Sequence, residues 1–394
     1  MLAYNARIIP LVLYPMSKYQ IVAKTLQNLE ELLSKELKSL GASKVKILKR
    51  AVSFEGTDEL LYKCNLSSRL AISFLVPIHS AEVNDENDLY KEIYALPWEE
   101  IFNPEKTIAI DASISGPNFN HSQYVALKTK DAIVDRLRNK LGFRPDVDVR
   151  DPDFKVNIHI HNSSLTVSLD SSGRTLDKRG YRLDAGQAPL NEVLAAGMLY
   201  MAEWNGETTL YDPMCGAGTF SIEAAMIAAK IPPGINRDFC FQNWYDYDYK
   251  LFVKVKEDLI SQITTPKEEF FASDLDSAML DFVQENAERA GVDKYIKVEK
   301  LNFFNSSARK ESGVIFLNPP YDQRLRMEDV FAFYKQIGDT FKQAYPNHQG
   351  WIISSNNEAL KKLGLKASFK TELNNGGTMC KVHKYDMYRG SKLA

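Results

Sequence analysis

Three short stretches of the chain combine residue types that could bind a small molecule and act on a ring amine. They are LYDPMCGAGTF (Leu210–Phe220), FFASDLDSAM (Phe270–Met279) and FLNPPY (Phe316–Tyr321). Each contains or follows an apolar, β-rich run, so each is expected at the end of a strand. The carboxyl ends of parallel strands meet at one edge of a sheet, where open α/β folds bind ligands. The three stretches therefore predict one shared site.

The first stretch predicts a strand, a glycine turn and the start of a helix. Gly216 and Gly218 allow a tight turn and a close approach by a ligand. Thr219 could cap the helix, whose N-terminus favours an anionic group such as a carboxylate. The pattern is GxG after Asp212-Pro, and it lacks the lysine of a triphosphate-binding loop. A lone GxG is also compatible with a simple structural turn.

The second stretch supplies an acidic strand end. Asp274 could accept hydrogen bonds from both hydroxyls of a ribose. Asp276 is the alternative, although it could instead cap the helix that begins near Ser277. Asn302, after the next strand, would reach an adenine edge, where its amide can accept and donate.

The third stretch predicts a stiff corner that holds an amine. Pro319 and Pro320 fix the backbone and donate no N–H. The Asn318 Oδ1 and the Pro319 carbonyl could then both accept from one exocyclic NH₂ group, while Tyr321 offers a face on which a base stacks. Two fixed acceptors would stabilise the charge that develops when such a nitrogen attacks.

The elements that must position these residues alternate as strands and helices from about residue 190. This rhythm predicts a doubly wound α/β sheet, and two β-like runs around Gly376-Gly377 predict a C-terminal hairpin. Upstream, residues 18–80 read as a small α/β unit, 81–170 as a second unit and 171–189 as a linker. Residues 1–17 are expected to be an extension, and a start at Met16 would leave a clean first strand.

Composition restricts the class of protein. The 394 residues are 44% hydrophobic and 25% charged, as in a soluble globular protein of two or three domains. No apolar run is long enough to span a bilayer. The four cysteines show no CxxC spacing and the histidines no cluster, which favours a reducing cytoplasm and argues against a metal site. His159 and His161 share a strand face but have no evident further ligands.

Charge is distributed unevenly along a chain whose net charge is −2. Residues 122–182 contain twelve lysines or arginines and eight aspartates. Such a segment suits a face that binds a nucleic-acid backbone, although a solvated charged surface explains it as well. The candidate RNA contacts in this segment are Lys128, Lys130, Arg136, Arg138, Arg179 and Arg182.

The motifs in this order resemble class I S-adenosylmethionine-dependent methyltransferases that act on exocyclic amines. Further stretches, SQYVALKTKDAIVDRLR, VSLDSSGRTLDKRGYR and APLNEVLAA, resemble THUMP-containing RNA guanine-N2 methyltransferases of the bacterial RlmL type. The resemblance covers nearly the whole chain from about Met16. It implies a ferredoxin-like unit, a THUMP domain and a Rossmann-like catalytic domain over 190–394. Some relatives carry a second methyltransferase domain, which is not expected here.

Carried over by resemblance, Asp212, Gly216 and Gly218 would line the methionine end of the cofactor. Cys215 and Thr219 are further candidates for cofactor binding in the same turn. We read Cys215 as a small packing residue of this turn. Asp274 would hold the ribose, and Asn302 stands where many relatives have Asp. Asn318, Pro319 and Tyr321 would hold the target base.

The expected activity is methylation of a guanine N2 amine in structured RNA, most simply 23S rRNA. The alternatives are methylation of a guanine N2 amine in tRNA, methylation of the adenine N6 amine in DNA, and a non-catalytic role in RNA assembly. A fragment from about Thr175 to Ala394 is expected to keep the cofactor site and to lose efficient RNA methylation.

Overall fold

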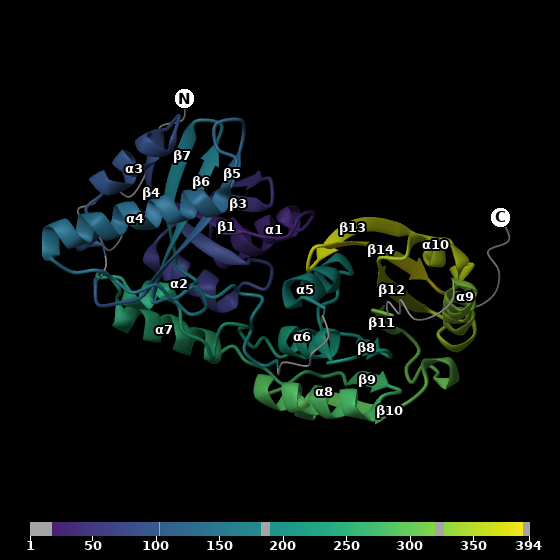
Figure 1. Ribbon diagram of the computed structural model, residues 1–394. Coiled ribbons are helices and arrows are strands. Elements are labelled where there is room, and N and C mark those ends of the chain that lie inside the picture. Colours follow the sequence, from purple (N-terminus) through teal and green to yellow (C-terminus); the bar gives the residue numbers. More distant parts are fainter. Residues whose placement is uncertain (1–17, 102, 183–189, 320–326, 389–394) are drawn as a thin grey trace. The chain divides into compact units, whose positions relative to one another are not determined.

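The computed structural model describes residues 18–101, 103–182, 190–319 and 327–388 (Figure 1). Tyr321 and the extension over 1–17 lie outside this part of the chain. The described chain forms two compact units, and some segments belong to the unit that their sequence position would not suggest. The first unit contains residues up to 25, 33–176 and 234–258, and the second contains 26–32, 177–233 and 259 onward.

The first unit is built on one seven-stranded sheet, in the order β2-β3-β1-β4-β7-β6-β5. Its strands are β1 (Tyr19–Lys24), β2 (Ser43–Leu48), β3 (Ala51–Gly56), β4 (Ser73–Glu82), β5 (Ile108–Ser115), β6 (Phe154–His161) and β7 (Ser164–Asp170). β4 pairs with β1 on one side and with β7 on the other. The two N-terminal regions that the sequence separates near residue 80 therefore share a single sheet.

Local signals define the helices of this unit. These are α1 (Glu30–Leu40), α2 (Asp58–Ser67), α3 (Glu86–Ala95), the 3-10 turn η1 (Trp98–Glu100) and α4 (Ser122–Leu141). Thr57 caps α2 and Asp85 caps α3 through their side chains. α4 ends at Gly142, whose φ of 71° lies in the left-handed region that favours glycine.

The second unit contains the predicted doubly wound sheet, in the order β10-β9-β8-β11-β12-β14-β13. Its strands are β8 (Thr209–Asp212), β9 (Phe270–Asp274), β10 (Ile296–Lys300), β11 (Gly313–Leu317), β12 (His348–Ser354), β13 (Phe369–Asn375) and β14 (Thr378–Asp386). The first five are parallel, whereas β14 pairs antiparallel with β12 and β13. The predicted C-terminal hairpin is confirmed, and Gly376 and Gly377 turn it with positive φ.

Helices cover this second sheet. They are α5 (Glu192–Met201), α6 (Thr219–Ala228), α8 (Ser277–Ala290), α9 (Met327–Ala344) and α10 (Asn357–Leu360), with the 3-10 turns η3 (Asp293–Tyr295), η4 (Phe303–Asn305) and η5 (Lys361–Leu363). On the α9 side, Tyr334, Ile337 and Phe341 pack with the strand residues Ile315 and Leu317 in one buried cluster. α6 and α8 pack together near β9.

Residues 234–258 form an arm that interrupts the predicted 190–394 domain and folds into the first unit. The arm contains η2 (Cys240–Asn243) and most of α7 (Tyr249–Ile260). Phe241 is buried and stacks on Tyr62 of α2, with ring centroids 4.6 Å apart. The Tyr62 hydroxyl accepts from the Asp248 N–H at 3.1 Å. This long-range aromatic pairing leaves no periodic signal in the sequence.

The stretch 171–189, predicted as a linker, is partly buried where the structure describes it, although Arg174, Lys178 and Gly180 are exposed. Ser171 and Ser172 are fully buried in the first unit, where the Asp170 carboxylate accepts from the Ser172 N–H at 2.9 Å. Arg179 and Tyr181 are buried in the second unit. The polar composition of the stretch is explained by internal hydrogen bonds. No helix among the described residues is long and apolar enough to cross a membrane.

Candidate active site

The sheet order brings the predicted strand-end residues to one edge. β9 and β11 flank β8, and β10 follows β9. Asp212 is the last residue of β8, and Asp274 is the last residue of β9. Asn302 follows β10 by two residues, and Asn318 directly follows β11. Since these four strands are parallel, all four side chains start from the same carboxyl edge.

The two glycines of the turn between β8 and α6, the glycine turn, have different roles. A Cβ added at Gly216, whose φ is 51°, would meet no atom within 4 Å, so the backbone is open to a ligand here. A Cβ at Gly218 would instead lie 2.9 Å from the Val283 side chain, so this glycine allows close packing on α8. Gly218 is also the N-cap of α6. The prediction that Thr219 caps the helix is therefore wrong, because Thr219 is already its first residue.

The turn is tied to the neighbouring strand β9. The Cys215 N–H donates to the Ser273 carbonyl at 3.1 Å, and the Gly216 N–H donates to the Asp274 Oδ2 at 3.0 Å. The Cys215 thiol is buried, and its pKa is raised well above the usual value by burial. A neutral, buried thiol agrees with the interpretation of Cys215 as a packing residue.

Asp212 lies beneath the turn, with 1% of its surface exposed. Its Oδ2 accepts from the Ser221 hydroxyl at 2.9 Å and from the Ser221 N–H at 3.3 Å. Burial is the main reason that the pKa of Asp212 is raised to about 7, and the nearby Asp274 carboxylate adds to it. Asp212 thus anchors the first turn of α6, and its direct contact with a cofactor remains a prediction.

Asp274 and Asp276 have different surroundings. Asp276 is the N-cap of α8, because its side chain accepts from the Ala278 N–H at 2.9 Å. The predicted capping role of Asp276 is confirmed. Asp274 binds the Gly216 N–H through one oxygen and the Asp276 N–H through the other, at 3.1 Å. Each of its oxygens keeps a further lone pair for a ligand hydroxyl.

Asn302 begins the short turn η4, and its Oδ1 accepts from the Phe304 N–H at 2.9 Å. The sequence assigns this Oδ1 atom to an adenine amine. In the structure it already accepts one hydrogen bond from its own turn, and its second lone pair is left for a ligand. Asn318 is half-buried and Pro319 is buried at the end of β11. Asn318 lies next to the wholly buried strand residue Leu317, which fixes the start of this corner.

Comparisons with known proteins address this arrangement. Residues 179–384 match the family described as RMKL-like, methyltransferase domain, residues 83–170 match the THUMP domain, and residues 20–72 match the RlmL ferredoxin-like domain. The chain belongs to the RMKL-like methyltransferase family. The expected Rossmann-like methyltransferase fold, with ferredoxin-like and THUMP regions before it, is confirmed.

Three relatives of this RMKL-like chain are informative. The protein slr0064 of Synechocystis sp., which carries the name of an RNA methyltransferase, is 38% identical over 93% of this chain and 96% of its own length. The ribosomal RNA large subunit methyltransferase K/L of Shewanella sediminis is 37% identical over 91% of this chain, which spans only 52% of that protein. The crystal structure of the methyltransferase SMU.472 with S-adenosylhomocysteine covers 95% of this chain and 99% of its own, with a TM-score of 0.84 and 28% identity.

S-adenosylmethionine is therefore the cofactor of this RMKL-like protein. The open backbone at Gly216 and the carboxylate of Asp274 beside it fit such a molecule, which carries a charged amino acid end and a ribose. The cofactor supplies an electrophilic methyl group when it is bound. Gly216, Asp212 and Asp274 are the residues that would hold it.

Replacing Asp274 with Ala is expected to weaken cofactor binding by about 2–4 kcal/mol, or roughly 30- to 800-fold in Kd. The change removes an acceptor for two ribose hydroxyls and also the bond that holds the Gly216 N–H. Asp276→Ala is the matched control, since it removes the α8 cap at a cost of about 1 kcal/mol in stability. Calorimetric titration measures both, and equal losses of affinity at the two positions would refute the assignment.

Cofactor affinity is expected to rise as the pH increases from about 6 to about 7.5. With a pKa of about 7, Asp212 is largely protonated at the lower pH. A cationic ligand favours the ionised carboxylate, so binding releases the proton and is aided by higher pH. In Asp212→Asn this rise should disappear, because the amide does not titrate. Titrations at several pH values in both proteins check this, and an unchanged rise in the variant would contradict it.

The predicted RNA contacts of the RMKL-like chain have diverse surroundings. On α4, Arg136 pairs with Glu99 at 2.6 Å, Arg138 pairs with Asp135, and Lys130 lies 2.6 Å from Asp131. Lys128 lies over the Tyr90 ring, 5.0 Å from its centroid. Among these three ion-paired side chains, that of Arg138 is the most exposed, with 56% of its surface accessible. Arg136 is held inside the unit, and the role of these four in RNA binding stays a prediction.

Arg179 and Arg182 belong to a buried network that the sequence does not reveal. Arg179 lies 3.4 Å from Glu223 of α6, and both are buried. Arg182 donates to the Thr219 hydroxyl at 3.0 Å and lies 3.1 Å from the Glu192 carboxylate. Arg179 therefore presents almost no surface to RNA in this arrangement. The network instead ties residues 179–182 to the helix that carries the cofactor turn.

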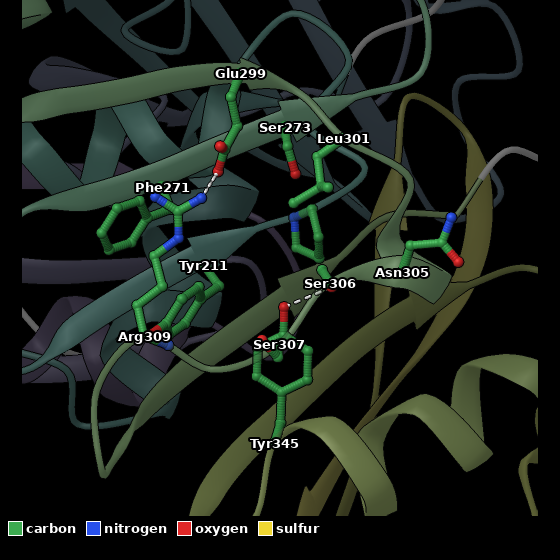
Figure 2. Close-up of a pocket in the computed structure, with 11 residues that line it drawn as sticks. Tyr211, Phe271, Ser273, Glu299, Leu301, Asn305, Ser306, Ser307, Arg309 and Tyr345 are labelled. Atoms are coloured by element: carbon green, nitrogen blue, oxygen red, sulfur yellow. Dashed lines mark hydrogen bonds and ion pairs between the residues drawn. The ribbon is translucent and has the colours of Figure 1, made fainter.

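A pocket of about 240 Å³ lies beside the ends of β8, β9 and β10 (Figure 2). Glu299 and Arg309 form an ion pair in it, and the Arg309 guanidinium lies 4.5 Å from the Phe271 ring centroid. The Tyr211 hydroxyl accepts from the Arg309 N–H at 2.9 Å. Among the described residues, none of those predicted for the site lines this pocket. Its contacts secure the segment between β10 and β11.

The two histidines on one face of β6 hydrogen-bond to the neighbouring strand. His159 and His161 bond the Ser113 and Ser115 hydroxyls of β5 at 3.0 and 2.9 Å. Within the described ranges, no group of three or more His, Cys, Asp or Glu side chains is placed to hold a metal ion.

Proposed function

We propose that this protein methylates the exocyclic N2 amine of a guanine in structured RNA, and that the RNA is 23S rRNA. The observation that carries the proposal is the position of Asn318 and Pro319, which follow β11 at the edge where the glycine turn and Asp274 also lie. An acceptor pair at this edge would hold a ring amine beside the methyl donor.

The chemistry asked of the chain is positioning and electrostatic stabilisation. The lone pair of a guanine amine is delocalised into the ring, so the nitrogen is a poor nucleophile. The Asn318 side-chain oxygen and the Pro319 carbonyl would accept from the NH₂ group, orient its lone pair and stabilise the positive charge that grows on it. No covalent intermediate with the protein is required.

The relatives support an RNA substrate. The K/L enzymes that match this chain are named for the large-subunit ribosomal RNA, and slr0064 is named for RNA. The THUMP match at 83–170 adds a region outside the catalytic sheet that would present structured RNA. The chain spans about half the length of the K/L relatives.

The decisive experiment is methyl transfer with isotopically labelled S-adenosylmethionine. Deproteinised 23S rRNA and total tRNA from a strain that lacks the gene, together with adenine-containing duplex DNA, serve as separate acceptors. We expect label in 23S rRNA, and mass spectrometry of its nucleosides should identify N2-methylguanosine. Label in tRNA instead would identify tRNA as the substrate, and label in DNA adenine would indicate a DNA methyltransferase. Cofactor binding without transfer to any acceptor would indicate an assembly factor.

A further inference from the structure

Lysines gather on the second unit after β12, outside the segment that the sequence marked as basic. Residues 356–384 contain six lysines and two glutamates, in a chain whose net charge is −2. Four of them, which we name the edge lysines, lie on η5, β13 and β14. The edge lysines are Lys361, Lys362, Lys370 and Lys381.

Contacts show that the edge lysines form one cluster. Glu358, at the start of α10, pairs with Lys361 at 2.7 Å. The bond from Lys361 is the main reason that the pKa of Glu358 is lowered, and Lys362 and Lys381 lower it further, so all three ammonium groups are near this carboxylate. Lys370 is paired with His383 across the β13–β14 register, and Lys381 precedes His383 by two residues on β14. Burial is the main reason that the pKa of His383 is lowered, and both lysines lower it further.

The negative groups facing the cluster do not balance it. Glu358 neutralises one lysine, and Glu372 lies directly opposite Lys381 in the β13–β14 register. Counting only the described residues, two positive charges remain. Lys361 keeps 68% of its side chain exposed, and Lys362 and Lys370 are exposed as well. A solvated surface patch could look like this, so the position of the cluster on the sheet decides its interpretation.

The strand register places the cluster at the catalytic edge. Leu317 of β11 is paired with Ile352 of β12, and Ser354 of β12 is paired with Lys381 of β14. Asn318 and Pro319 follow Leu317, so Pro319 and Lys381 are at the same level of the sheet. Neighbouring strands are about 4.8 Å apart, which puts the Lys381 backbone roughly 10 Å from the proposed acceptor corner. Figure 1 shows α10 and the β13–β14 hairpin beside β12.

We infer that the edge lysines bind phosphates of the RNA strand next to the nucleotide being methylated; this rests on the proposed function. Each strand of a DNA double helix carries one phosphate per about 3.4 Å of helix axis, and successive phosphates along a strand are farther apart than this axial rise. A distance of roughly 10 Å therefore reaches at most the phosphates within about three nucleotides of the target. Lysine binds phosphate as a flexible point charge, which suits a strand that must be distorted so that a base can leave its stack.

With this contact, the second unit as well as the first unit would bind RNA. Phosphate contacts position the substrate without reading its sequence. The edge lysines would fix the register of the strand across the site, and the selection of the RNA would remain with other contacts.

The test compares two triple variants that remove the same charge. The edge variant is K361Q/K362Q/K381Q. The control variant is K267Q/K294Q/K297Q, whose lysines are exposed near the amino ends of β9 and β10, at the opposite edge of the sheet. Binding of full-length protein to deproteinised 23S rRNA is measured at several salt concentrations, together with cofactor affinity and methyl transfer.

The edge variant is expected to raise KM for RNA at least ten-fold at physiological salt, and to lower the salt slope of log K by about 2. Its cofactor affinity should match that of the unchanged protein. The control variant should keep the original slope, and K361R/K362R/K381R should restore binding because the charge returns.

The outcomes separate the two proposals. If the unchanged protein methylates RNA and the edge variant has the same salt slope as the control variant, the phosphate contact is overturned and the proposed function stands. Loss of cofactor affinity in the edge variant would also overturn it, since that indicates a structural role. If the unchanged protein neither binds nor methylates RNA, the proposed function fails and this inference fails with it.

Discussion

Replacing Asn318 with Ala is expected to slow methyl transfer by about 10²–10³-fold or more while cofactor affinity stays within a few-fold. Removing one preorganised group that stabilises developing charge typically has an effect of this size. Asn318 follows β11, whereas the residues around the glycine turn belong to β8 and β9. The loss should therefore appear in kcat/KM for RNA. Single-turnover transfer and calorimetric titration of the cofactor measure the two quantities separately.

A matched control is available on the neighbouring strand. Asn356 follows β12 by two residues and caps α10 by accepting from the Ala359 N–H at 2.9 Å. Asn356→Ala makes the same chemical change near the same edge, and should cost about 1 kcal/mol in stability with little effect on transfer. If cofactor binding collapses in Asn318→Ala, or if both variants lose transfer equally, the assignment of Asn318 to the target base is wrong.

The sequence predicted most of this site because its signals are local. An apolar run that ends in Asp212, Asp274 or Asn318 indicates a strand and its end, and the alternation of strands and helices indicates that these ends share an edge. The hairpin around Gly376 and Gly377 is a local signal of the same kind. The direct contacts of these residues with cofactor and base are still predictions.

What the sequence did not reveal depends on contacts between distant segments. Arg179 reads as a basic surface residue, yet it pairs with Glu223, 44 positions away. Thr219 is a better cap than glycine by local preference, but the tight packing of Gly218 on Val283 decides the turn. Lys381 reaches the catalytic edge only because β14 pairs with β12, and no single-residue pattern encodes that pairing.

The arm shows the same limit and changes what a truncated protein should do. A fragment from Thr175 to Ala394 keeps every predicted cofactor residue. However, it also keeps residues 234–258, which fold with the first unit. Phe239, Phe241, Trp244 and Phe252 are each at most 7% exposed in that packing. The fragment would expose them, and would lose Leu29, a buried residue of the second unit that packs on Gly197 of α5.

We therefore expect the 175–394 fragment to aggregate or to unfold without a cooperative transition, and to bind S-adenosylmethionine much more weakly than the full chain. Large apolar patches on a monomer promote association. Gel filtration, thermal denaturation and cofactor titration measure this. A fragment that unfolds cooperatively and binds the cofactor like the full chain would show that the second unit does not depend on the packing of the arm in the first unit.

Point variants in the full chain test the same packing without truncation. Phe241→Ala removes a buried ring that stacks on Tyr62, and should destabilise the protein by about 3–5 kcal/mol. Tyr249→Ala is the matched control, because Tyr249 lies on the same arm with 67% of its surface exposed, and should change stability by about 0.5 kcal/mol or less. The arm belongs to the stretch that matches the methyltransferase domain, yet it packs in the first unit. A lower Tm in Phe241→Ala alone would therefore mean that part of the methyltransferase-matching sequence helps to stabilise the first unit.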